Sequence, residues 1–569
     1  MAMRADEVGD AVRKITGSRI LSQGDSSVAT LRWQADPFWH SARASFINTV
    51  GINGLVTRRM SLLVCGLMVV FPFADLLAGD AEHGTSALRE PVAVYNNWSA
   101  YDELSDNVEL TEDLAMRQLR EILRLRKHGV RIDYYLMDAF WFDPRGGYRA
   151  FRKPHWPNGP DRWLEGCKQA GIKPGLWFAS NSLRKLEPIP EWWSSLAADG
   201  KALSMFEGGY LSHLMETLQI WYDRGVRLYK FDFAELAAAT PAAAARMKKD
   251  EVVEANSQAL RRALAEFKRK NPDALFTAFN GFGGRYSGTF HPIEQTVDTR
   301  WLEVFDALYC GDPRPADVPM FNFWRAQDVY SDHMVRYYQA NGVPLTRIDN
   351  TGFMVGTTGT CYRRGTSAWE SMLVLQHARG GWLNQYYGNL ELIDDRRSVL
   401  FAKVQRMFFQ LLSTGRTETF GGLPGRGEPY GFVTANRSGA VCTTLNPSQS
   451  VVHVQLPVSR LSQELTRRQR ILFADPGFKP TLSHGQVSLG PEQMVVIGFG
   501  SYAEKEWDLG TGSDIRIPSV IKPLQVTVSS TGHNTIEVRT HIPRGSSLRI
   551  LMRQTLNGQP RRVSGGAPP

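Results

Sequence analysis

The sequence predicts an α/β protein in which a (β/α)8 TIM barrel is followed by an all-β antiparallel sandwich. From residue 91 to about residue 410, short apolar strand-like segments alternate with amphipathic helical segments, and eight such strands can be recognised. After that point the chain contains only short β-rich segments separated by Asn, Gly, Pro and Ser. A doubly wound sheet would more often carry a glycine-rich nucleotide turn after its first strand, and none occurs here.

The first two elements show the barrel pattern. A strand is predicted at residues 92–97, and a helix begins near Thr111, which is a suitable N-cap before the acidic Glu112 and Asp113. Lys127-His128-Gly129 ends this helix. The other strands are predicted at residues 132–138, 173–178, 226–232, 275–280, 307–312, 343–349 and 382–387. Eight strands with intervening helices are what a closed barrel requires, so residues 91–410 are expected to form it and residues 411–569 the sandwich with a frayed tail.

Composition excludes several classes of protein. The 569 residues include 43% hydrophobic residues, and the net charge of +9 comes from basic residues that are scattered among acidic ones. A nucleic-acid surface would gather basic residues on one face, so no nucleic acid is expected as a partner. The five cysteines have neither a disulfide-framework pattern nor metal-ligand spacing, and no metal or cofactor is expected.

The region before the barrel resembles a secretory signal. An apolar run at residues 61–74 follows Arg58-Arg59-Met60 and precedes small residues. The run is short for a bilayer core of about 30 Å. Residues 60–81 are therefore interpreted as a signal peptide or membrane anchor, and residues 1–59 as an over-extended or disordered N-terminus. The expected location is secreted or periplasmic, without a stable membrane span after processing; an anchored protein facing outside is the alternative.

The predicted strands end repeatedly in carboxylates, at the positions where barrels carry functional groups. Asp232 ends the fourth strand and Asp312 the sixth. A buried carboxylate is costly unless a site pairs or solvates it, so packing alone does not explain these residues. Two carboxylates around a barrel mouth are typical of glycoside hydrolysis, in which one attacks the anomeric carbon and the other protonates the departing oxygen. Lys230 points to the same side as Asp232 and can keep it ionised.

Aromatic and polar residues near the strand ends are candidates for binding a sugar substrate, either an oligosaccharide or a glycoside. Tryptophan faces cover the apolar faces of sugars, and polar side chains bind the hydroxyl groups. The candidate binding residues are Trp98, Asp138, Trp141, Trp177, Lys230, Asn280 and Arg285. Asp349 is interpreted as local turn structure because Thr351-Gly352 follows it.

Four segments resemble, in order and spacing, motifs of the melibiase superfamily, the α-galactosidase-like enzymes of glycoside hydrolase families 27 and 36 in clan D. They are Tyr95-Asn96-Asn97-Trp98, Met137-Asp138-Ala139-Phe140-Trp141-Phe142, Lys173-Pro174-Gly175-Leu176-Trp177-Phe178 and Tyr229-Lys230-Phe231-Asp232. The resemblance covers residues 91–410, and a barrel followed by a β-sandwich is similar to the family 27 layout. It implies that Asp232 is the nucleophile and Asp312 the acid/base. It also implies that Asp138 and Lys230 bind sugar hydroxyls and that Arg285 lies in a Gly-rich turn.

One departure leaves the sugar open. The family usually has two adjacent aspartates on the second strand, whereas Ala139 follows Asp138 here, so another α-linked sugar than galactose stays possible. The resulting hypothesis is a retaining glycoside hydrolase that cleaves terminal α-linked sugars by double displacement. A transglycosylase on the same barrel and a catalytically decayed carbohydrate-binding barrel are the alternatives.

Overall fold

The computed structural model describes residues 90–98, 100, 110–139, 141–282, 297–311, 318, 320, 322–350, 352–356 and 368–512. It also describes the backbone of strands at 18–23, 26–34, 526–532, 535–543, 550–556 and 559–565. The predicted signal or anchor at residues 60–81 lies outside these ranges, as do Asp312 and Arg285. The chain divides into a larger unit, which contains residues 90–282 and most of the chain up to residue 512, and a smaller unit built from the terminal strands.

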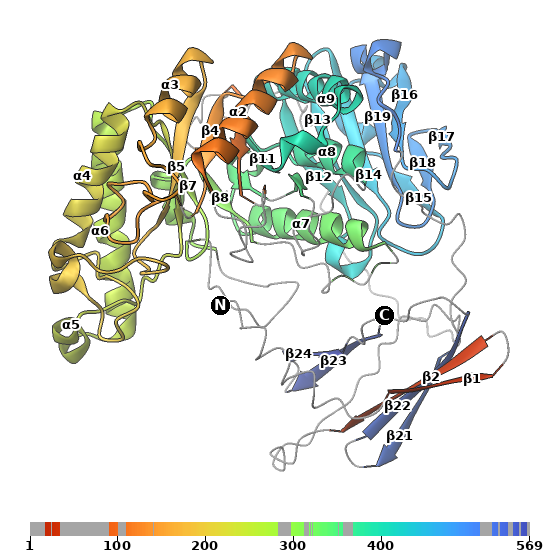
Figure 1. Cartoon of the computed structure of the whole chain (residues 1–569). Coiled ribbons are helices and arrows are strands. Elements are labelled where there is room, and N and C mark those ends of the chain that lie inside the picture. The colour runs from red at the N-terminus through yellow and green to blue at the C-terminus, as the bar shows by residue number, and fades with distance from the viewer. Residues whose placement is uncertain are drawn as a thin grey trace, which may run out of the picture. The chain divides into compact units, whose positions relative to one another are not determined.

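A parallel sheet of nine strands forms the centre of the larger unit, in the order β10-β11-β3-β4-β5-β6-β7-β8-β9. Figure 1 labels β4, β5, β7, β8 and β11 of this sheet. The strands are β3 (Val92–Asn96), β4 (Tyr134–Met137), β5 (Lys173–Ala179), β6 (Leu228–Asp232), β7 (Leu275–Ala278), β8 (Ala307–Tyr309), β9 (Ile348–Asp349), β10 (Met354–Val355) and β11 (Leu383–Gly388). The sheet curls back on itself, because β9 and β11 are in contact and the Trp382 amide donates to the Thr346 carbonyl over 3.1 Å. The predicted TIM-like fold is confirmed; β10 is an additional short strand.

Helices connect most of the successive strands, as the alternating pattern predicts, whereas only η4 lies between β7 and β8 in the described part of the chain. They are α2 (Glu112–Lys127), α3 (Asp161–Gln169), α4 (Tyr210–Asp223), α5 (Pro241–Arg246), α6 (Lys249–Lys270), α7 (Phe323–Ala340), α8 (Trp369–Ala378) and α9 (Asp395–Thr414), with short 3-10 turns η3 (Pro190–Ser195), η4 (Thr299–Glu303), η6 (Leu345–Arg347) and η7 (Leu390–Leu392). The predicted cap of α2 is confirmed, because Thr111 Oγ1 accepts a hydrogen bond from the Leu114 amide over 3.3 Å. In the ranges that the structure describes, no helix has the length and apolar character needed to cross a bilayer.

Apolar side chains fill the part of the barrel interior that lies toward the amino ends of the strands. One buried cluster joins side chains on or next to β3, β4, β6 and β11: Val94, Tyr134, Leu136, Leu228, Trp382 and Leu383. Lys230 and Asp232 follow Leu228 at intervals of two residues on β6, so their side chains point to the same interior face. The interior-facing residues are therefore apolar toward the amino ends of the strands and polar at their carboxyl ends.

The predicted β-sandwich follows α9. A six-stranded sheet has the order β12-β13-β14-β19-β16-β20, and a three-stranded sheet has the order β15-β18-β17. The strands are β12 (Arg416–Gly421), β13 (Tyr430–Ala435), β14 (Gly439–Leu445), β15 (Val452–Gln455), β16 (Gln469–Ala474), β17 (Leu482–Ser483), β18 (Gln486–Leu489), β19 (Met494–Gly500) and β20 (Gly510–Thr511). Short helical turns connect them: η8 (Pro424–Arg426), η9 (Val458–Arg460), α10 (Gln463–Thr466), η10 (Ser501–Ala503) and η11 (Lys505–Trp507). Side chains of both sheets, such as Val487 and Ile497, share one apolar core.

Buried ion pairs connect the sandwich to barrel helices. Arg325 on α7 bonds Asp475, which follows β16, and neither side chain is exposed. Asp332 on α7 accepts hydrogen bonds from Arg379 after α8 and from the Tyr430 hydroxyl on β13. These contacts fasten α7 and α8 to the sandwich at sites shielded from water.

The smaller unit contains a four-stranded antiparallel sheet in the order β1-β2-β22-β21. Its strands are β1 (Ser18–Gln23), β2 (Ser26–Gln34), β21 (Val526–Gly532) and β22 (Thr535–Pro543), and β23 (Ile550–Leu556) pairs with β24 (Gln559–Gly565). Strands from the range 1–59 thus pair with strands from the range 411–569. The predicted domain boundaries themselves stay a prediction.

Candidate active site at the barrel mouth

A buried ion pair lies at the centre of the barrel mouth. Lys230 Nζ on β6 is 2.7 Å from Oδ2 of Asp138, which directly follows β4, and the two side chains are only 4% and 2% exposed. The same ammonium lies 3.8 Å from the centre of the Phe279 ring. The structure thus brings together two residues that the sequence predicts for sugar binding, although they are far apart in the chain.

Asp232 ends β6 beside this pair and is held by several donors. Its Oδ1 accepts hydrogen bonds from the Phe233 amide at 2.8 Å, from the Asn280 amide at 3.1 Å and from Asn280 Nδ2 at 3.0 Å. Its Oδ2 accepts one from Trp177 Nε1 at 3.1 Å. Burial raises the pKa of Asp232, while the Lys230 charge and the Trp177 hydrogen bond oppose that rise. Asp232 therefore has a fixed orientation, with the candidate binding residues Trp177 and Asn280 both beside it.

Local backbone geometry places the donors around Asp232. Phe233 has a φ of 48°, a left-handed conformation that is unusual for a residue other than glycine and is typical of functional sites. Gly281 follows Asn280 with a φ of 102°, and an added Cβ there would lie 2.3 Å from the Ala234 carbonyl oxygen. Only glycine permits this approach of the two segments, which are joined by the hydrogen bond from the Ala234 amide to the Asn280 carbonyl.

Asp349, interpreted from the sequence as turn structure, ends β9 at the same mouth. It is 1% exposed, and its Oδ2 accepts a hydrogen bond from Gln385 Nε2 on β11. Burial raises its pKa to about 7, although the Lys230 charge and the Gln385 hydrogen bond act in the opposite direction. The sequence signal for this residue is an apolar strand that ends in a carboxylate, and a turn signal, Thr351-Gly352, follows it.

Two predicted tryptophans have different environments. Trp98 is partly buried and packs against an aromatic cluster in the mouth that includes Phe279, Tyr309 and Tyr387. Trp141 is fully buried, donates from Nε1 to the Trp177 carbonyl at 2.8 Å, and packs on Trp221 of α4 behind the strands. The placement of Trp141 supports packing behind Trp177 rather than direct contact with a sugar. Asp312 and Arg285, the remaining predicted residues, fall in segments outside the described ranges.

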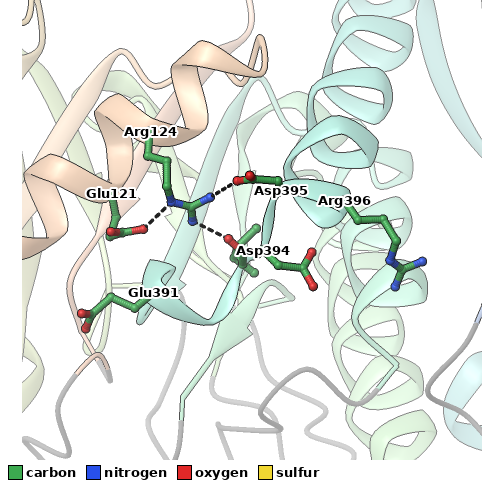
Figure 2. Close-up of a pocket in the computed structure, with 7 residues that line it drawn as sticks. Glu121, Arg124, Glu391, Asp394, Asp395 and Arg396 are labelled. Atoms are coloured by element: carbon green, nitrogen blue, oxygen red, sulfur yellow. Dashed lines mark hydrogen bonds and ion pairs between the residues drawn. The ribbon is translucent and has the colours of Figure 1, made fainter.

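A separate surface pocket of about 620 Å³ lies between α2 and the start of α9 (Figure 2). Arg124 in this pocket is bonded by Glu121 at 2.7 Å, by Asp395 at 3.0 Å and by the Ile393 carbonyl. The protein itself therefore uses most of the hydrogen-bonding capacity of this arginine. No group of three metal-ligating side chains occurs among the residues that the structure describes. The barrel mouth, with its buried carboxyl groups around one ammonium, is the better candidate for chemistry.

Comparisons with known proteins agree with the fold. No protein-family model matches the sequence, and no curated protein matches it. The structure is similar to the GH36 α-galactosidase AgaB from Geobacillus stearothermophilus, with a TM-score of 0.50 and 15% sequence identity over 72% of this chain and 55% of that one. A variant of the GH36 α-galactosidase AgaA from the same organism, solved with stachyose, matches with the same four values. The chain therefore shares the fold implied by its resemblance to the melibiase superfamily, and it spans about half the length of these enzymes.

Proposed function

We propose that the protein is a retaining glycoside hydrolase that cleaves terminal α-linked sugars, with Asp232 as the nucleophile. The observation that carries this proposal is the unequal hydrogen bonding of the two Asp232 oxygens. Oδ1 accepts three hydrogen bonds, whereas Oδ2 accepts one from Trp177 within the described part of the chain. Oδ1 is thereby used to orient the carboxylate, and Oδ2 retains electron-pair capacity for attack on an anomeric carbon.

The charges in the mouth support this role. A carboxylate nucleophile must be ionised, and burial works against ionisation. The Lys230 ammonium and the donors of Trp177 and Phe233 favour the charged form. Because these groups are buried and held by the strands, their interactions are weakly screened and need little rearrangement during reaction.

The proposed reaction has two steps, for which the sequence supplies Asp312 as the acid/base. In the first, Asp232 Oδ2 attacks the anomeric carbon while the Asp312 carboxyl gives its proton to the departing oxygen. In the second, the Asp312 carboxylate takes a proton from water, which displaces Asp232 and releases the sugar. Two displacements retain the configuration, and this mechanism requires a separation of about 5–5.5 Å between the carboxyl groups.

An α-galactoside is the proposed substrate class. The fold similarity to AgaB supports this class, and the AgaA variant was solved with stachyose. Asp138 and Lys230 form a buried polar pair that can bind adjacent sugar hydroxyls. Ala139 has no carboxylate to add to this pair. The proposal therefore names α-galactosides first among several α-linked sugars.

The test is hydrolysis of nitrophenyl α- and β-glycosides, beginning with those of galactose and N-acetylgalactosamine. We expect the wild type to cleave an α-glycoside and Asp232→Asn to lose about 10³-fold or more in kcat. Asp232→Ala with added azide is expected to form a glycosyl azide of inverted configuration, because azide replaces the missing nucleophile.

Asp133→Asn is the matched control. Asp133 lies before β4 at the opposite end of the barrel, where its Oδ2 accepts a hydrogen bond from the Ala93 amide. We expect its activity to stay within about threefold of wild type, since a surface change away from the site has small effects. Sugar binding without any turnover by the wild type would instead favour the decayed barrel, and sugar transfer exceeding hydrolysis would favour the transglycosylase.

A further inference from the structure

We propose that Asp349 contacts a hydroxyl group of the bound sugar through Oδ1 and so helps to determine which sugar the site accepts. This inference rests on the proposed function and deepens it. Asp349 ends β9, where its register partner is Tyr309 of β8, a member of the aromatic cluster in the mouth. It therefore joins the barrel mouth from a strand that β11 and β3 separate from β4 and Asp138.

The orientation of Asp349 is set by a chain of hydrogen bonds across β3, β11 and β9. The Trp98 amide donates to Asn96 Oδ1 at 2.9 Å, which leaves Asn96 Nδ2 as the donor to Gln385 Oε1 at 3.0 Å. Gln385 Nε2 is then the atom that donates to Asp349 Oδ2. A backbone amide can only donate. The Trp98 amide therefore determines which atom of Asn96 and of Gln385 donates and which accepts in this series of hydrogen bonds.

The other carboxyl oxygen of Asp349, Oδ1, is available for a further hydrogen bond. Asp349 Oδ1 is buried and has no hydrogen-bond partner of good geometry among the described residues, although the Asn350 amide is close enough to favour the charged form slightly. Buried polar atoms in folded proteins are nearly always satisfied by protein, water or ligand. An orphaned oxygen at the mouth of a barrel is therefore suited to a ligand hydroxyl.

The balance of charge supports the same conclusion. Asp138, Asp232 and Asp349 lie around Lys230, whose ammonium is bonded to Asp138 at 2.7 Å. One ammonium does not compensate three buried carboxylates, and burial raises the pKa of Asp349 to about 7. Asp349 can thus donate a hydrogen bond when protonated and accept one when ionised. Sugar hydroxyls are able to play either complementary part.

The experiment compares Asp349→Ala and Asp349→Asn on the nitrophenyl α-glycoside that the wild type cleaves best and on its monodeoxy derivatives. Asparagine can accept the Gln385 hydrogen bond and still donate to a sugar, so its kcat/KM is expected within about fivefold of wild type. Alanine is expected to lose about 10- to 100-fold on the parent substrate. On the one derivative that lacks the bound hydroxyl, alanine is expected to lose no more than about twofold.

A purely structural role gives a different pattern, because alanine would then reduce kcat/KM equally on every derivative. That result overturns the inference, as does an unchanged kcat/KM on the parent substrate. Circular dichroism and the thermal midpoint check that both variants fold. If Asp349→Ala does not fold, Asp349→Asn is measured on the same substrates in its place.

Failure of the proposed function is recognised separately, by the absence of turnover in the wild type. Calorimetric binding of galactose, N-acetylgalactosamine and their monodeoxy forms then replaces kinetics, with the same expected pattern for Asp349→Ala. If the wild type binds these sugars and Asp349→Ala loses binding equally for all of them, the inference about Asp349 is rejected and the proposed function is not. If no sugar of the panel binds to wild type, both proposals are rejected.

Discussion

Lys230 Nζ and Asp138 Oδ2 meet at 2.7 Å although their strands, β6 and β4, are separated in the sheet by β5. The contact therefore crosses the barrel interior rather than following the sheet. Removing one partner of a buried ion pair leaves the other charge without compensation, at a cost of about 3–5 kcal/mol. This pair makes both the mouth geometry and the charge of the neighbouring Asp232 sensitive to a single substitution.

Lys230→Met is expected to lower kcat/KM by about 100-fold or more. It is also expected to move the acid limb of the pH profile, where kcat/KM falls at low pH, to higher pH. Lys230 favours the ionised form of Asp232, so its removal raises the pKa of Asp232 further. Since the proposed nucleophile acts as a carboxylate, activity is lost as the pH falls through that pKa, and the loss then begins at a higher pH. The measurement is kcat/KM between pH 4 and pH 8.

Lys268→Met is the matched control for this substitution. Lys268 Nζ lies 2.8 Å from the buried Asp306 Oδ2, but Asp306 precedes β8 at the amino end of the strands. The control is expected to lower the free energy of unfolding while leaving the acid limb of kcat/KM in place. An identical shift of both variants would contradict the assignment of Lys230.

Trp177→Phe tests the hydrogen bond to the proposed attacking oxygen. Phenylalanine keeps an aromatic ring at a position stacked on Phe142, but it cannot donate to Asp232 Oδ2. We expect kcat/KM to fall about tenfold, with a larger loss at pH 5 than at pH 8, because the lost hydrogen bond had favoured the charged carboxylate. Trp156→Phe, which removes a bond to the Leu110 carbonyl, is the control and should show no such pH dependence.

Asp349→Asn makes stability less dependent on pH. The folded state holds the Asp349 proton up to about pH 7, whereas an unfolded aspartate releases it near pH 3.8. Ionisation of the unfolded chain therefore lowers the wild-type free energy of unfolding as the pH rises through this window. The groups that face Asp349 are the Lys230 ammonium and the Cys310 thiol, whose pKa burial raises to about 12.

Asp349→Asn lacks this titration. Its free energy of unfolding minus that of the wild type should therefore increase from pH 4 to pH 7, by at most on the order of 4 kcal/mol. Urea unfolding of both proteins at several pH values measures the difference. A difference that stays constant across this range would show that Asp349 is ionised in the folded protein throughout.

Asp475→Asn is expected to reduce the free energy of unfolding by about 1.5–3 kcal/mol, because Arg325 stays buried and keeps Asp328 as an ionic partner but loses the charge of Asp475. The Arg325–Asp475 pair lies between α7 and the sandwich, away from the mouth, so kcat of the folded enzyme should not change. Denaturant unfolding gives the first quantity and kinetics the second. Glu187→Gln, which breaks an exposed pair with Arg145, should cost less than about 0.5 kcal/mol.

Most of the barrel could be predicted from periodicity. Runs such as residues 226–232 and 382–387 are short, rich in apolar residues and separated by helical segments, and each matches an observed strand to within two residues. Asp138, Lys230, Asp232, Trp177 and Asn280 meet in the structure because parallel strands bring their carboxyl ends to one face. The pairing of β2 with β22 was not predictable in this way, since it joins segments at opposite ends of the chain.

Side-chain direction was harder to predict than strand position. Trp141 is near a strand end but turns behind the sheet onto Trp221, where a large ring gains more from burial among other aromatic side chains. Asp349 is followed by turn residues, yet β9 extends far enough to carry its carboxyl into the mouth. In both cases the deciding factor is packing against elements that are distant in the chain.

The sequence by itself determined the alternation of strands and helices, the class of the fold and the residues at the ends of the strands, because these follow from local periodicity and from the parallel arrangement. The tertiary structure alone decided which strand ends share a hydrogen bond: Lys230 with Asp138, Trp177 with Asp232, and Gln385 with Asp349. The physical reason is that barrel closure and strand register fix these distances, and both depend on contacts summed over the whole sheet.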